Sequence, residues 1–183
     1  MTSTNHLEAW LAQEQSIRAA MDAGPGPGVA RPDQIAGKTG LELMQAMLRG
    51  EIPYPHIAQT MDFLIVEAGL GHAVFQGTPG VAHLNPMGSV HGGWFATMLD
   101  SALGCAVHTR MKPGQGYTTA ELSVNIVRAL TPKVTRVRAE GKVIHCGRQL
   151  ATADARLVGP DGTLYAHATT TCLVFEIPPQ STT

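Results

Sequence analysis

The stretch from Val90 to Val107 constrains the fold more than any other part of the chain. It is predominantly apolar, it contains three glycines, and its only side chain charged at neutral pH is Asp100. His91, Asp100 and the glycines argue against a membrane span, so we predict a long core helix that ends near Arg110. A helix that is apolar on nearly all sides has to be surrounded by other elements.

Period-two alternation dominates the chain after this helix, and this pattern is typical of strands. We predict strands at 119–126, 135–143, 151–157 and 164–175, the last two joined by a turn at 159–162. Two short strands at 63–67 and 72–76 precede the helix. In the strand at 119–126 the alternation predicts two faces, one with Ala120, Leu122, Val124 and Ile126, the other with Thr119, Glu121, Ser123 and Asn125.

The order of these elements predicts an α+β protein in which a strongly twisted antiparallel sheet wraps around the long helix. Small residues on the inner face of the sheet would allow the helix to approach closely. They are Ala139, Gly141, Ala151, Ala153, Ala166 and Ala168.

The first 38 residues form an extension to this arrangement. Residues 6–22 have helical periodicity with Asn5 as a candidate N-cap, and the glycine-proline run at 24–28 is a linker. We therefore divide the chain into an arm at 1–38, which packs on the core or on a partner, and a domain at 39–178. The domain should open with a helix from Thr39 to Gly50 that buries Leu41, Leu43, Met44, Met47 and Leu48.

Composition excludes several functions. A formal net charge of −1 gives no global attraction to nucleic acid or an anionic membrane. The three cysteines have no metal-ligand spacing, nor do the histidines, so we expect reduced, buried thiols and no metal or cofactor. The absence of a signal-peptide pattern at the start of the sequence favours a cytoplasmic protein.

Asp100 is the strongest candidate for chemistry. An ionised carboxylate among apolar neighbours is costly unless it is paired, and a merely exposed helix stripe would need more polar companions than Thr97. We interpret Asp100 as a functional acid.

His91-Gly92-Gly93 opens the same helix, where unpaired backbone N–H groups favour an anion or oxyanion. Gly92 and Asp100 are eight positions apart, about 12 Å along a helix axis. A short aspartate side chain does not span that gap. If both residues serve one site, they come from different subunits of a two-fold dimer.

Other polar residues keep two interpretations open. Asn85 either positions a substrate carbonyl or water, or only forms a turn with Pro86, and Thr118 and Thr119 either contact the acid or only begin a strand. The basic residues in the second half form either a solvated sheet face or a site for nucleotide phosphates. They are Arg128, Lys133, Arg136, Arg138, Lys142 and Arg148.

The motif running from Asn85 through His91-Gly92-Gly93 to Asp100 closely resembles the PaaI-like, or phenylacetate-pathway, type of hotdog-fold thioesterase. The resemblance continues through 118–126, 147–154 and 161–170, and it covers about residues 60–176. It implies a hotdog fold, a homodimer often paired into a homotetramer, and sites across the dimer interface.

The resemblance also implies roles for single residues. Asp100 would be the nucleophile or general base, and the Gly92 amide would polarise the thioester carbonyl. Asn85 would orient water or substrate, and His91 would order the loop around the thioester carbonyl. A threonine from the strand after the helix would assist catalysis. Alignment on the strand gives Thr119, whereas counting positions from Asp100 gives Thr118. Gly93, Arg128 and Arg148 are expected to contact the substrate, an aryl- or medium-chain acyl-CoA.

Two other classes stay open. A hotdog hydratase or dehydratase also acts on acyl-CoA but commonly has His five residues after its acid, where this chain has Cys105. A non-catalytic acyl-CoA-binding or regulatory protein has no need for a desolvated acid, so retention of Asp100 argues against it.

Overall fold

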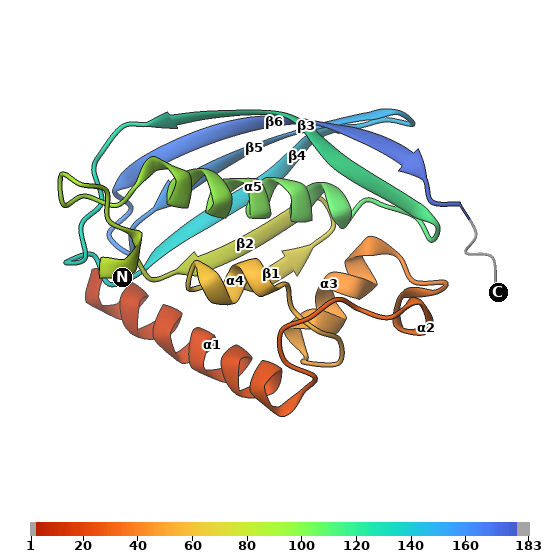
Figure 1. Ribbon diagram of the computed structural model, residues 1–183, viewed down its shortest axis with the longest axis horizontal. Coiled ribbons are helices and arrows are strands. Elements are labelled where there is room, and N and C mark those ends of the chain that lie inside the picture. The colour runs from red at the N-terminus through yellow and green to blue at the C-terminus, as the bar shows by residue number, and fades with distance from the viewer. Residues whose placement is uncertain (1–2, 179–183) are drawn as a thin grey trace.

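One six-stranded antiparallel sheet curves around a long helix, α5 (Figure 1). The computed structural model describes residues 3–178. The elements in chain order are α1 (Ser3–Ala23), α2 (Pro32–Ile35), α3 (Gly40–Leu48), α4 (His56–Thr60), β1 (Phe63–Gly69), β2 (His72–Gly77), a 3₁₀ turn (Val81–His83), α5 (Gly92–His108), β3 (Gln115–Ile126), β4 (Val137–Cys146), β5 (Leu150–Val158) and β6 (Leu164–Glu176). The predicted α+β order is confirmed.

The strands lie in the order β1-β2-β4-β5-β6-β3, and every neighbouring pair is antiparallel. β3 is therefore an edge strand, and most of its second half is exposed. A long unpaired edge offers backbone groups to another chain.

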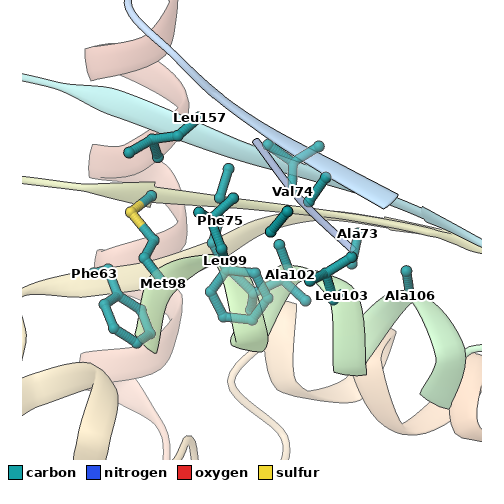
Figure 2. Close-up of a cluster of buried hydrophobic side chains, with 14 of the residues drawn as sticks. Phe63, Ala73, Val74, Phe75, Met98, Leu99, Ala102, Leu103, Ala106 and Leu157 are labelled. Carbon is teal, nitrogen blue, oxygen red and sulfur yellow. The ribbon is translucent and has the colours of Figure 1, made fainter. Parts of the chain in front are cut away.

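The core lies between α5 and the concave face of the sheet (Figure 2). Met98, Leu99, Ala102 and Leu103 of α5 have no solvent-exposed surface. The small residues predicted on the inner face of the sheet are all buried. At Gly141 an added Cβ would lie 2.3 Å from the carbonyl oxygen of Ala102, so only glycine allows this close approach of strand and helix.

The N-terminal helix α1 lies on the opposite face of the sheet, beside β1, β2 and β4. Gln13 Nε2 donates to the carbonyl of Val66 on β1, and Glu14 accepts from the fully buried Gln76 on β2. Because α1 begins at Ser3, Asn5 lies inside the helix, and its prediction as the N-cap is wrong.

The predicted helix after residue 38 is confirmed as α3. Thr39 caps it, and Thr39 and Glu42 form a reciprocal capping box. Met44 is buried, whereas the other four residues predicted for its apolar face are partly exposed. The division into an arm and a domain stays a prediction.

No helix within residues 3–178 combines the length and the apolar character that crossing a membrane requires.

Candidate active site

Asp100 lies in the middle of α5, beside the edge strand β3. Thr119 Oγ1 donates a hydrogen bond of 3.0 Å to Asp100 Oδ1. The acid is partly exposed in the single chain, rather than buried as its apolar neighbours in the sequence suggested. The reason is topological: among residues 3–178, no strand lies beyond β3 to cover this part of the helix.

A β-bulge aims Thr119 at the acid. Thr119 pairs with the buried Cys172, whereas Glu121 pairs with Thr171 on the other face of β6, so Ala120 is an extra residue between them. A bulge of this kind reverses the facing of side chains on its two sides. The prediction that Thr119 shares a face with Glu121 is therefore wrong.

Thr118 occupies the opposite face of β3. It pairs with the exposed Leu173, and it is next to Thr119 in the chain, so its side chain points away from α5. Of the two threonines, Thr119 is the one that contacts Asp100.

The start of α5 presents an unused backbone donor. His91 is the N-cap, and its Nδ1 accepts a 2.9 Å hydrogen bond from the N–H of Gly93. The Trp94 N–H donates to the carbonyl of His91. Within residues 3–178 the Gly92 N–H donates to no protein acceptor. An unsatisfied N–H at the positive end of a 17-residue helix is suited to an anionic oxygen.

Asn85 shapes the loop before α5. Its Oδ1 accepts from the N–H groups of Met87 and Ser89, and its Nδ2 donates to Ser89 Oγ at 2.9 Å. The side chain therefore holds its own loop in place. Beside the loop is an open hollow of about 300 Å³, which Asn85, Gly92, Phe95, Ile126 and Arg128 help to line.

Asp100 and Gly92 lie in different places within one chain. Asp100 does not line the hollow beside Gly92, and the two residues are on the same helix, about 12 Å apart along its axis. Within one chain the acid and the free amide therefore lie in two separate places.

The two arginines expected to meet the substrate lie at opposite ends of β6. Arg128 donates its backbone N–H to the carbonyl of Tyr165, near the start of β6. Arg148 lies in the exposed β4–β5 turn, next to Gln149, whose carbonyl accepts from the N–H of Val174 near the end of β6. Arg128 is at the hollow beside Gly92.

Two other basic residues are engaged by α1 and are only slightly exposed, so they are not available to a nucleotide. Arg136 Nε donates to Glu14 of α1 at 2.6 Å, and Arg138 donates to Gln76 and Gln13. Both interpretations of a basic sheet face are wrong for these two positions, because α1 covers them.

Sequence reasoning missed three residues that surround Asp100. Burial, with a further contribution from the charge of Asp100, raises the pKa of Cys105 to about 12 and also raises the pKa of Cys172. Burial and nearby negative charges, that of Asp100 among them, also raise the pKa of Tyr117. The period-two pattern could have identified Tyr117, because it lies two residues before Thr119 on the same face of β3. Cys172 is buried as expected, but Cys105 and Cys146 are partly exposed.

The family model of the thioesterase superfamily matches residues 87–166 of the chain, a range that includes Asp100 and Gly92. A phenylacetic acid degradation-related protein from Ralstonia eutropha JMP134 is 30% identical, with a TM-score of 0.65 over 71% of this chain and 98% of that one. The chain belongs to the thioesterase superfamily.

Further similarities agree with this assignment. A mutant of the phenylacetic acid degradation protein PaaI from Thermus thermophilus is 25% identical, with a TM-score of 0.58 over 64% of this thioesterase and 97% of that protein. A thioesterase family protein from Silicibacter pomeroyi is 25% identical, with a TM-score of 0.61 over 66% and 89% of the two chains. A comparison with curated proteins gives no match. The predicted PaaI-like hotdog family and the predicted enzyme class, a thioester hydrolase, are confirmed.

Proposed function

We propose that this thioesterase hydrolyses an aryl- or medium-chain acyl-CoA to the free acid and CoA, in sites formed between two subunits. The observation that carries the proposal is the pair of half sites: a carboxylate fixed by Thr119, and an unused N–H at Gly92. Phenylacetic acid degradation, named for two of the similar proteins, supports an aryl-acetyl group as the acyl class.

Edge pairing of two β3 strands would unite the half sites. Thr119 lies beside Asp100, and Ile126 lies beside Gly92, where an added Cβ would be 3.3 Å from Ile126 Cδ1. If Thr119 of one subunit is opposite Ile126 of the partner subunit, the acid of one chain lies near the amide of the other. Two-fold symmetry then creates two equal sites. A further pairing of dimers into a tetramer stays a prediction.

In the assembled site, the thioester carbonyl oxygen would accept a hydrogen bond from Gly92 of the partner subunit. Such a preorganised donor stabilises the negative charge that develops on this oxygen, typically by about 3–4 kcal/mol. Arg128 of the partner subunit lies next to this amide and would face the CoA phosphates.

Two routes for Asp100 follow from the geometry. Thr119 holds Oδ1, which leaves Oδ2 for the reaction. As a nucleophile, Oδ2 attacks the carbonyl carbon, the C–S bond breaks, CoA leaves as a thiolate, and water hydrolyses the resulting anhydride. As a general base, Oδ2 accepts a proton from water while that water attacks, and the thiolate leaves.

Steady-state thiol release tests the reaction, with acetyl-, hexanoyl-, decanoyl-, phenylacetyl- and benzoyl-CoA as substrates. Asp100→Asn should lower kcat by about a thousandfold or more and keep binding, because only the charge is lost. Asp154→Asn on β5 is the matched control and should leave kcat unchanged. Full activity in Asp100→Asn would refute the mechanism.

Subunit mixing tests the shared site. Gly92→Pro removes the unused N–H at the first position of α5, where proline is tolerated. Gly92→Pro and Asp100→Asn should each be inactive. Random exchange should restore about one quarter of wild-type activity, because half of the dimers are mixed and each mixed dimer has one intact site. No recovery in mixed dimers would show that the sites lie within single chains.

A further inference from the structure

Tyr117 lies near Asp100, one helical turn further along α5. This residue lies on β3, pairs with the buried Val174, and points toward α5 like Thr119. Its phenol oxygen lies over Gly104, where an added Cβ would approach it to 2.8 Å. Gly104 follows Asp100 by four residues, which is one turn along the same side of the helix.

The surroundings of Asp100 differ between the two directions along α5. Toward the C-terminus the Tyr117 ring is followed by His108, with the ring centroids 5.6 Å apart. Toward the N-terminus the residues one turn away are Ala96 and Thr97, which are small and partly exposed. A group bound at Asp100 therefore has room toward the start of the helix and meets an aromatic ring toward its end.

The chemistry of the substrate decides which of its ends meets this ring. The nucleotide of CoA carries several charges and is costly to bury, whereas an acyl group gains from an apolar surface. Tyr117 and Cys105 combine a mostly apolar setting with some remaining accessible surface beside the acid. The acyl group is thus the end that suits this side of Asp100.

We propose that Tyr117, seated on Gly104, is the end wall of the acyl pocket and limits the length of the acyl group. The inference rests on the proposed function and narrows it, because it favours aryl-acetyl and short acyl groups over longer chains. Gly104 is a positioning residue, since any side chain there would displace the phenol.

The test compares kcat/KM for decanoyl-CoA and phenylacetyl-CoA in three variants. Tyr117→Ala should raise the decanoyl-to-phenylacetyl ratio on the order of tenfold or more, because opening a pocket by several methylenes changes discrimination by at least that factor. Tyr117→Phe keeps the ring and should keep the wild-type ratio. Tyr117→Leu should give an intermediate ratio, and it replaces Tyr117→Ala if the latter does not fold.

Binding separates this inference from the proposed function. In the Asp100→Asn background, affinities are measured for thioether analogues of the same two esters, which the enzyme does not hydrolyse. Tyr117→Ala should strengthen decanoyl binding relative to phenylacetyl binding even in this inactive protein. An unchanged ratio in both assays, with folding and oligomeric state intact, overturns the role of Tyr117 while leaving hydrolysis at Asp100 standing. If no ester is hydrolysed by the wild type but the analogues bind with the expected ratio, the hydrolytic proposal fails and the pocket stands.

Discussion

The helices α5 and α1 lie on opposite faces of the same sheet and are held by different kinds of contact. α5 contributes apolar side chains with no exposed surface, among them Met98 and Leu103. α1 contributes mostly polar ones. Its only buried apolar residue among those described is Met21, near its end, and its buried charged residue is Glu14, with 4% exposed.

Glu14 is the centre of the contact between α1 and the sheet. Its carboxylate accepts hydrogen bonds from Gln76 and Arg136, each at 2.6 Å, and from Arg18 at 2.8 Å. Nearby, Arg138 donates to Gln13 at 2.8 Å and lies 4.4 Å from the centroid of the Trp10 ring.

This difference separates what forms the fold from what is added to it. Removing α5 would expose the whole concave face of the sheet, which water does not compensate. Removing α1 would expose several groups that water satisfies almost as well, so a polar network of this kind fixes position more than it adds net stability. We expect substitutions under α5 to affect global unfolding and substitutions under α1 to affect mainly the attachment of that helix.

The largest effect is expected for Gly141→Ala, under α5. The new methyl group would meet the backbone carbonyl of Ala102 at 2.3 Å, and neither backbone yields easily. We expect a loss of about 3 kcal/mol in the free energy of unfolding, measured with urea. Gly69→Ala is the matched control, because a Cβ at that strand position meets nothing within 4 Å. Equal losses in the two variants would show that the close approach of β4 and α5 is not required.

What the sequence could predict also differs between α5 and α1. The core helix and the strands around it were predictable, because periodicity reports which side chains are buried. Gly141 and the alanines beside it indicated the close approach. By contrast, the attachment of α1 depends on residues far apart in the chain, such as Glu14 and Arg136, and no local pattern links them.

The candidate site was predictable in its residue types more than in its geometry. The lone acid and the glycines at the start of the helix stand out in the sequence. However, the bulge at Ala120 reversed the facing of Thr119, and alternation alone gives no sign of an inserted residue. The position of β3 at the sheet edge exposed Asp100, and strand order is not encoded in periodicity.

The second-largest effect is expected for Glu14→Ala. The change leaves Arg136, Gln76 and Arg18 without their shared acceptor on a largely buried surface. We expect the free energy that attaches α1 to the sheet to fall by about 2 kcal/mol. This loss is smaller than for a fully buried pair, because Arg136 and Arg18 both keep some contact with solvent. Hydrogen exchange should locate the loss in α1 and leave α5 protected. Glu8→Ala, at an exposed position of the same helix, should change neither the stability nor the hydrogen exchange of α1.

A smaller effect is expected for Trp10→Ala. Its ring lies against the guanidinium of Arg138, and contacts of this type contribute about 1 kcal/mol. The Trp10 carbonyl, which accepts from Gln76, is unchanged by the substitution. Faster exchange of the α1 amides, with the urea midpoint of the domain nearly constant, is the expected result. Leu11→Ala, at a more exposed position, is the control. A global loss as large as that of Gly141→Ala would contradict the separation between the two helices.

The smallest effect concerns pH and isolates the charge of Glu14 from its shape. Burial acts to raise the pKa of Glu14, but the hydrogen bonds from Arg136, Arg18 and Gln76 outweigh it and lower the pKa below the ordinary value of 4.5. The folded protein therefore favours the charged form, and the resulting stabilisation is complete above about pH 4.5 and is lost as the pH falls through the folded-state pKa.

Glu14→Gln has nearly the same shape and does not titrate, so the difference between it and the wild type measures this charge alone. The protection of the α1 amides should be greater in the wild type at pH 7, and this difference should shrink as the pH is lowered below about 4.5, through the folded-state pKa of Glu14. The α5 amides should show no gap at either pH, because none of the contacts of Glu14 reaches that helix. A gap in α1 that stays constant over this whole range would mean that Glu14 acts through packing, and that the two helices differ less in kind than their contacts indicate.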